Sequence, residues 1–238
     1  MKSLLLLLLG AGKLGKLLTT GGTMLLSIAA YALVYGWRYG AGFVGLLLCH
    51  EMGHFVAARQ RKLPVGLPTF IPFMGAWIEM KEMPKDVETE AYVGVAGPLV
   101  GTLAALCCYG LAREFDSRLL LALAYAGCFL NLFNLIPLAP LDGGRVTAIL
   151  SPRVWLLGVP VLAAVFFWRP SPVLILIGLL ALPQLAAAWH YDPQAPDNQR
   201  YYAVSLDDRL TYGALYLGLI VFLSLMVQNL HAELGSGT

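Results

Sequence analysis

Long apolar stretches separated by short polar ones run along most of the chain. A helix that spans a bilayer needs about 20 apolar residues, with a range of about 17–25. The apolar segments are 21–37, 41–58, 93–112, 118–138, 154–168, 173–190 and 210–229. Segment 154–168 is short and contains Pro160, so it spans only if neighbouring helices satisfy its backbone. We therefore predict an all-α polytopic membrane protein with about six to seven transmembrane helices.

Composition supports this class. The chain is 58% hydrophobic and only 13% charged, against about 25% charged residues in an ordinary soluble domain. Its mean hydropathy is +0.71. The net charge of +2 comes without a long basic run, so we expect the lipid bilayer as a partner and no nucleic acid. Nothing in the pattern specifies an oligomeric state.

We divide the chain into three parts. Residues 1–20 resemble a secretory signal, but their apolar run is shorter than the usual core of about 7–15 residues, and Lys13 and Lys16 follow it directly. We therefore predict an interfacial or re-entrant segment here. Residues 21–150 are the predicted catalytic membrane core, and residues 151–238 are predicted C-terminal transmembrane helices.

The positive charges predict an orientation. If the N-terminus is cytoplasmic and seven segments cross the membrane, twelve of the sixteen lysine and arginine residues lie on the inside. The other four are Arg38, Arg113, Arg118 and Arg169. A reversed topology would invert this bias.

The segment 41–58 contains H50-EMG-H54, which has the form H-E-x-x-H. On a helix, positions i and i+4 share one face, so two imidazoles there can bind one zinc ion at about 2.0–2.1 Å. Glu51 then lies where it can take a proton from a water molecule on the metal. The alternative is that His50 and His54 have hydrogen-bond partners in a helix bundle and Glu51 pairs with an arginine. Three ionisable groups in one turn of a spanning segment favour a functional site.

A second polar cluster, N131-LFNLIPLAPLDGGR-V146, ends an apolar segment and contains Asp142. Its prolines and glycines break a helix, which lets the carboxylate turn inward. Alternatively, the Asp-Gly pair is an ordinary turn. In the predicted topology His50, His54 and Asp142 reach a similar depth on the cytoplasmic side, which favours a shared site.

Together, H50-EMG-H54 and N134-LIPLAPLDGG-R145 resemble the site-2 protease family of intramembrane zinc metallopeptidases. The segments 35–50, 70–81 and 90–101 are also similar to the family, so the resemblance covers roughly residues 1–150. It implies one zinc ion per chain, held by His50, His54 and Asp142. It also implies that Glu51 acts as general base and acid, and that Asn134 steadies the substrate carbonyl.

For Asn134 we favour this catalytic role, as an amide that donates to developing negative charge, over a structural one. For Asn131, one turn earlier, we favour an interhelical hydrogen bond. The pair Gly97 and Gly101 has small-xxx-small spacing, which is typical of close helix packing.

The stretch 67–81 is too short for two spans and resembles the family's membrane-associated β-loop, with Met74 and Gly75 at a turn. A substrate helix must unwind before its peptide bond is accessible, and a strand edge could accept it by β-addition. The alternative is an interfacial loop in which Trp77 is an aromatic anchor.

These observations predict an intramembrane zinc metalloprotease that hydrolyses a peptide bond in or near a transmembrane segment of another membrane protein. We expect a multi-pass protein of the cell membrane with its active site toward the cytoplasm. The alternatives are a membrane metal-ion transporter and a non-catalytic zinc-binding scaffold. The outer halves of the segments hold almost no carboxylates, and a scaffold does not need Glu51, so both are less favoured.

Overall fold

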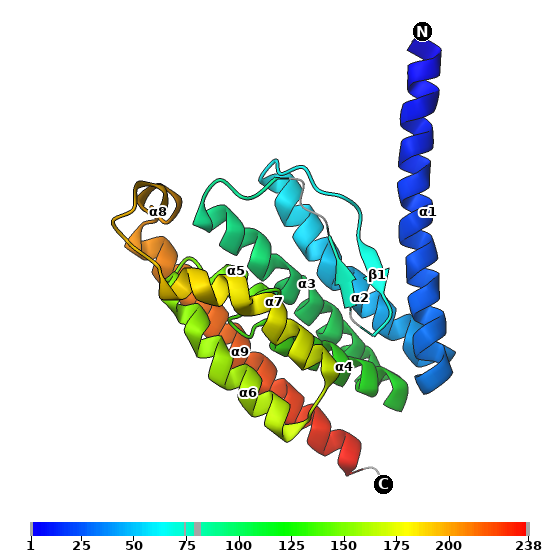
Figure 1. Ribbon diagram of the computed structural model, residues 1–238. Coiled ribbons are helices and arrows are strands. Elements are labelled where there is room, and N and C mark those ends of the chain that lie inside the picture. The colour runs from blue at the N-terminus through cyan, green and yellow to red at the C-terminus, as the bar shows by residue number, and fades with distance from the viewer. Residues whose placement is uncertain (1, 74, 79–81, 237–238) are drawn as a thin grey trace.

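The structure is a computed structural model that describes residues 2–73, 75–78 and 82–236. It is a bundle of helices with one short hairpin (Figure 1). Its helices are α1 (Lys2–Tyr35), α2 (Trp37–Gln60), α3 (Val87–Glu114), α4 (Arg118–Asn134), α5 (Asp142–Thr147), α6 (Gly158–Trp168), α7 (Pro172–Trp189), α8 (Pro196–Tyr201) and α9 (Leu206–Gly235). A 3-10 helix, η1 (Pro152–Leu157), precedes α6. The strands are β1 (Thr69–Ile71) and β2 (Gly75–Trp77).

Within the described residues, five helices are long and apolar enough to cross a membrane: α1, α2, α3, α7 and α9. The predicted all-α, multi-pass membrane fold with a small β-loop is therefore confirmed. Two of the seven predicted segments give shorter helices. Helix α4 has 17 residues. The segment 154–168 is divided between η1 and α6, which has only 11 residues.

Two features of the helices go beyond what the apolar pattern predicts. Helix α1 continues through residue 20 without a break, so the predicted interfacial segment and the first predicted span share one helix. The polar stretch 191–209 contains a short helix, α8. Pro196 begins this helix, where its missing N–H costs nothing, and Asp197 favours the positive end of the helix dipole.

Helix α8 is attached to the bundle. The Tyr201 hydroxyl donates to Oε2 of Glu90 on α3 at 2.5 Å. Burial, followed by the neighbouring Glu90 carboxylate, raises the pKa of Tyr201 above its usual value. The phenol therefore stays a neutral donor, and the α7–α9 connection is held against α3.

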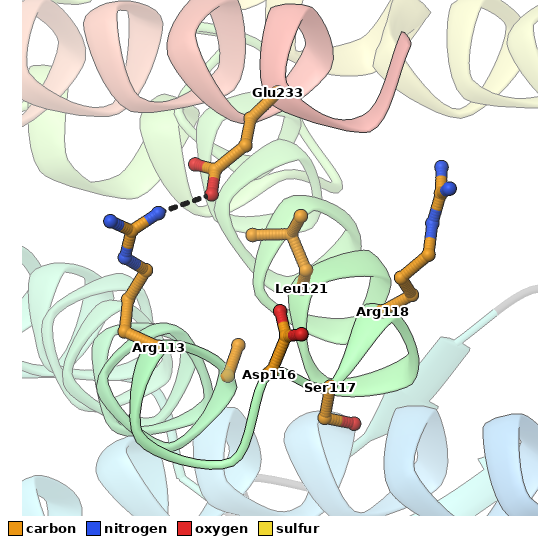
Figure 2. Close-up of a pocket in the computed structure, with 7 residues that line it drawn as sticks. Arg113, Asp116, Ser117, Arg118, Leu121 and Glu233 are labelled. Carbon is orange, nitrogen blue, oxygen red and sulfur yellow. Dashed lines mark hydrogen bonds and ion pairs between the residues drawn. The ribbon is translucent and has the colours of Figure 1, made fainter. Parts of the chain in front are cut away.

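Helices α2, α3 and α4 form the centre of the bundle, with α1 on one side and α9 on the other (Figure 1). The apolar core between α4 and α9 includes Leu121, Ala124, Tyr216 and Leu223. At the far end of these helices, Arg113 pairs with Glu233 at 2.7 Å, and a guanidinium N–H of Arg118 donates to the Leu234 carbonyl at 2.9 Å. These contacts line a polar cavity of about 280 Å³ and tie the C-terminal end of α9 to the α3–α4 turn (Figure 2).

The hairpin is antiparallel, with Phe70 opposite Ala76. It packs against the first two helices, because the buried Phe70 side chain lies in a cluster with Tyr31, Val44 and Leu47. The predicted extended arms of the β-loop are confirmed. Met74 and the side chain of Trp77 lie outside the part of the chain that the structure describes.

Candidate metal centre

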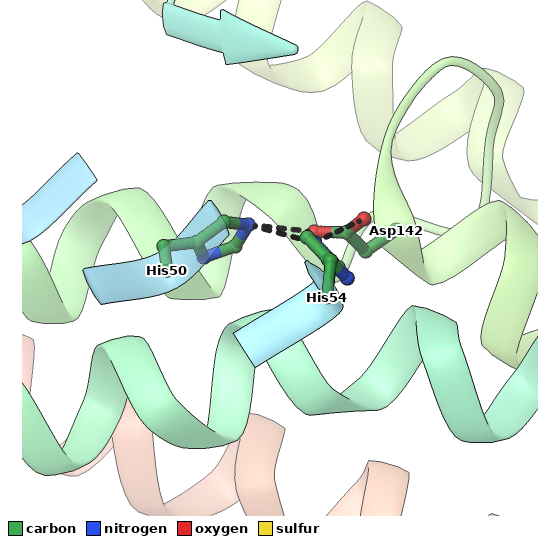
Figure 3. Close-up of side chains that lie close together, drawn as sticks. All are labelled: His50, His54 and Asp142. Carbon is green, nitrogen blue, oxygen red and sulfur yellow. Dashed lines mark hydrogen bonds and ion pairs between the residues drawn. The ribbon is translucent and has the colours of Figure 1, made fainter. Parts of the chain in front are cut away.

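Three buried side chains from two distant segments meet at one point (Figure 3). His50 and His54 lie one turn apart on α2, and Asp142 is the first residue of α5. The Nε2 atom of His50 lies 3.0 Å from Oδ2 of Asp142, and the Nε2 atom of His54 lies 3.1 Å from Oδ1. The two Nε2 atoms are 3.1 Å apart. His50, His54 and Asp142 are 3%, 7% and 8% exposed, respectively, so the cluster is largely closed to bulk water.

Hydrogen bonds on the far side of each imidazole determine its tautomer. His54 Nδ1 lies 2.7 Å from the Val93 carbonyl oxygen, which can only accept, so this nitrogen carries the proton. His50 Nδ1 lies 2.8 Å from Oδ1 of Asn131. The Asn131 amide nitrogen donates to the Gly127 carbonyl at 2.7 Å, which confirms that its oxygen faces His50. In its neutral form each histidine therefore presents the lone pair of Nε2 to the cluster.

This arrangement fits a metal ion. With neutral imidazoles, two nitrogen lone pairs and a carboxylate converge at 3.0–3.1 Å. Such groups repel unless a cation lies at their centre. In a tetrahedral zinc site with bonds of about 2.0–2.1 Å, ligand atoms are about 3.3 Å apart, which is close to the observed separations. The fourth coordination position of such a site is open.

The comparisons with known proteins agree with this chemistry. Residues 39–117 match peptidase family M50, a range that contains His50, Glu51 and His54 and ends before Asp142. The resemblance to the site-2 protease family is thereby confirmed.

Two curated relatives and one solved structure are similar to this chain. A protein named zinc metalloprotease, from Methanocaldococcus jannaschii, is 33% identical over 146 residues, or 59% of this chain and 42% of its own length. A protein named "probable zinc metalloprotease, chloroplastic", from Arabidopsis thaliana, is 27% identical over 49% of this chain and 29% of its own length. The chain thus spans less than half the length of either relative. The site-2 protease structure from M. jannaschii matches with a TM-score of 0.46 at 22% identity, covering 76% of this chain and 87% of that one.

Three glycines on α3 leave room for the candidate metal site. A Cβ atom on Gly97 would collide with the His54 imidazole, and one on Gly101 would collide with the Asn131 amide. A Cβ on Gly94 would come within 3.0 Å of the Arg145 Cβ, just after Asp142. The predicted close packing at Gly97 and Gly101 therefore occurs inside the chain, directly behind the metal residues.

Replacing Gly97 by alanine is expected to weaken metal binding, although Gly97 is not one of the proposed metal ligands. The methyl group occupies the space of the His54 ring, and overpacking of this kind costs about 1–3 kcal/mol. If the ring moves, affinity for Zn²⁺ should fall roughly 10–100-fold, measured by chelator competition. Gly110 on the same helix has nothing within 4 Å of its Cβ position, so Gly110→Ala is the control. Equal affinity in both variants would contradict this packing argument.

The two glycines that follow Asp142 also allow close packing near the site. A Cβ on Gly143 would collide with the carbonyls of Leu135 and Ile136, and one on Gly144 would lie 2.8 Å from the Ala139 nitrogen. The Gly144 carbonyl also accepts a hydrogen bond from the Trp155 indole N–H at 2.7 Å. Helix α5 thus begins pressed against the loop that precedes it.

The other predicted residues lie in different positions. Glu51 is buried on α2 beside His50, with 7% of its surface exposed. Asn134 is the last residue of α4 and is half-buried, and its side chain forms no hydrogen bond within the described chain. Asn131 forms the predicted interhelical bond, and its partner is His50. The roles of Val93 and Trp155 were not predicted, because a carbonyl and an indole carry no motif.

Proposed function

We propose that this chain is an intramembrane zinc metalloprotease that hydrolyses a peptide bond in or near a transmembrane segment of a membrane protein. The observation that carries this proposal is the convergence of two imidazole Nε2 atoms and one carboxylate inside a bundle of apolar helices, next to a buried glutamate. The family match and the metalloprotease names of the relatives support it.

In the proposed reaction His50, His54 and Asp142 hold the zinc ion. When bound, zinc polarises a carbonyl and lowers the pKa of a water molecule to about 7. The Glu51 carboxylate takes a proton from the attacking water and then delivers it to the leaving amine nitrogen. The surrounding apolar helices exclude bulk water, which strengthens the hydrogen bonds made to the reacting groups. Asn134, with an uncommitted amide, donates to the carbonyl oxygen of the scissile bond.

The hairpin supports a route for binding the unwound substrate. The Phe70 N–H donates to Oγ1 of Thr23 on α1 at 3.3 Å. The backbone N–H and C=O of Phe70 therefore point away from β2. In an antiparallel pair, two opposite residues either both direct their backbone N–H and C=O toward the partner strand or both direct them away from it. Ala76, opposite Phe70, therefore points its N–H and C=O away from β1. The outward N–H of Phe70 on β1 is bonded to α1, so the edge proposed for the substrate is that of β2, the strand beside α2.

Replacing Ala76 by proline is expected to slow cleavage about two- to tenfold. Proline removes the outward N–H and blocks the edge, yet proline is tolerated where an edge N–H faces outward. One peptide hydrogen bond is worth about 0.5–1.5 kcal/mol. The measurement is the cleavage rate of a transmembrane peptide, with Ala76→Ser, which keeps the N–H, as the control. Full activity in Ala76→Pro would mean that the substrate does not add to β2.

We further propose that the active site opens toward the cytoplasm and that the protein resides in the cell membrane. The bias of twelve basic residues against four supports this orientation. In this orientation α8 and the end of α2 that follows His54 lie on the cytoplasmic side, and the hairpin reaches from that side into the bundle beside α1 and α2.

The function is tested by incubating the purified, zinc-loaded protein with a mixture of synthetic single-span peptides in the same micelles. Mass spectrometry should detect products whose new termini fall within or next to the apolar segment. Zinc transport into liposomes, without any peptide product, would instead support a transporter and overturn the proposal.

A further inference from the structure

Helix α7, in the C-terminal third, contacts the loop that precedes Asp142. Loop residues Ile136, Leu138 and Leu141 form an apolar cluster with three α7 residues, Leu174, Ile177 and Ala181. The resemblance stated above covers only roughly residues 1–150, so it suggests no role for this helix in the metal centre.

One polar contact stands out within this apolar interface. Between residues 135 and 141, Pro137 and Pro140 have no N–H. The N–H groups of Leu135, Ile136, Leu138 and Leu141 donate to carbonyls of the loop itself or of the end of α4. The remaining donor, the Ala139 N–H, donates to Oε1 of Gln184 on α7 at 2.5 Å. Gln184 therefore completes the hydrogen bonding of this loop.

The same side chain lies against the start of α5. A Cβ atom on Gly144 would lie 2.8 Å from the Ala139 nitrogen and 3.0 Å from Nε2 of Gln184. Asp142 is thus placed between Ala139, which Gln184 holds, and Gly144, which packs on both of them. A shift of Gln184 would move this turn and the carboxylate with it.

Asp142 tolerates little movement, because its two oxygens face different imidazoles at 3.0 and 3.1 Å. We propose that Gln184 is a positioning residue for the metal centre: its amide oxygen holds the Ala139 N–H and thereby fixes the orientation of the Asp142 carboxylate. This inference rests on the proposed metal centre and adds α7 to the elements that set its metal affinity.

The test uses the metal-stripped full chain in micelles, titrated with Co²⁺, whose ligand-field absorption reports coordination geometry. Gln184→Leu removes the acceptor and should weaken Co²⁺ binding about 10–100-fold, as loss of a supporting group around metal ligands does. Its absorption bands should also change. Gln184→Glu keeps an acceptor oxygen and should stay within about threefold of wild type. Gln228→Leu makes the same change at an exposed position of the spanning helix α9 and is the control.

The outcomes separate this inference from the proposed function. If wild type binds Co²⁺ and Gln184→Leu has the same affinity and spectrum, the positioning role is wrong and the metal centre stands. A Gln184→Glu variant as weak as Gln184→Leu would also overturn it. If wild type binds neither Co²⁺ nor Zn²⁺, the metal centre itself fails. Should Gln184→Leu not elute as a single species, Gln184→Met replaces it, and wild-type binding in that variant would equally contradict the proposal.

Discussion

Replacing Glu51 by glutamine is expected to abolish peptide cleavage while the protein still binds zinc. Glutamine has nearly the same shape, but it cannot take a proton from water at neutral pH. General acid–base catalysis contributes about 10²–10⁴-fold to a rate. Because Glu51 is proposed to act both as the general base and as the general acid, we expect a loss near the upper end of this range. The measurement is the cleavage rate of a transmembrane peptide, together with the zinc content of the same sample.

The control for this experiment is Glu114→Gln, which makes the same change at an exposed carboxylate on α3. It should leave both cleavage and zinc content unchanged. A Glu51→Gln variant with wild-type activity would refute the proposed mechanism. A variant that loses zinc along with activity would show instead that Glu51 supports the metal site.

Replacing Asp142 by alanine is expected to remove most of the bound zinc. Wild type should contain one zinc ion per chain, and the variant should bind at least about a hundredfold more weakly, since even supporting residues outside the ligand set contribute about 10–100-fold. The loss has a clear physical cause, because Asp142 is the only carboxylate that faces both imidazoles among the described residues. Zinc per chain, measured after purification without chelator, is the readout.

Asp207→Ala, at an exposed position in the first turn of α9, is the matched control. Loss of zinc in Asp142→Ala alone would establish that two segments about ninety residues apart build one site. Absence of zinc from wild type would mean that the His50–His54 turn is helix packing, and the protease proposal would be abandoned.

The sequence could indicate the three metal-binding candidates because each has a local signal. The i, i+4 spacing places His50 and His54 on one helix face, and a carboxylate at the end of an apolar segment is rare enough to attract attention. The partner of Asn131 could not be predicted. Its bond to His50 depends on how closely α2, α3 and α4 approach, and that distance is set by contacts such as the one at Gly101.

The fold shows the same limit. Hydropathy located the apolar segments, but it could not show that α1 runs without a break or that η1 and α6 divide segment 154–168. Where helices begin and end depends on capping and packing as well as on apolar content. The contact between Gln184 and Ala139 joins residues 45 positions apart, and an isolated glutamine in an apolar helix carries no pattern that would reveal its partner.

The glycine face of α3 has a consequence for how the protein responds to its bilayer. Gly94, Gly97 and Gly101 bring α3 into contact with the elements that carry Asp142, His54 and Asn131. Proteins meet a mismatch in hydrophobic thickness by tilting helices or by deforming the lipid. Because α2, α4 and α5 all rest on this one helix, a thinner or thicker membrane should tilt them together. The depth of the metal residues relative to one another would then be independent of lipid chain length, although α3 itself supplies none of them.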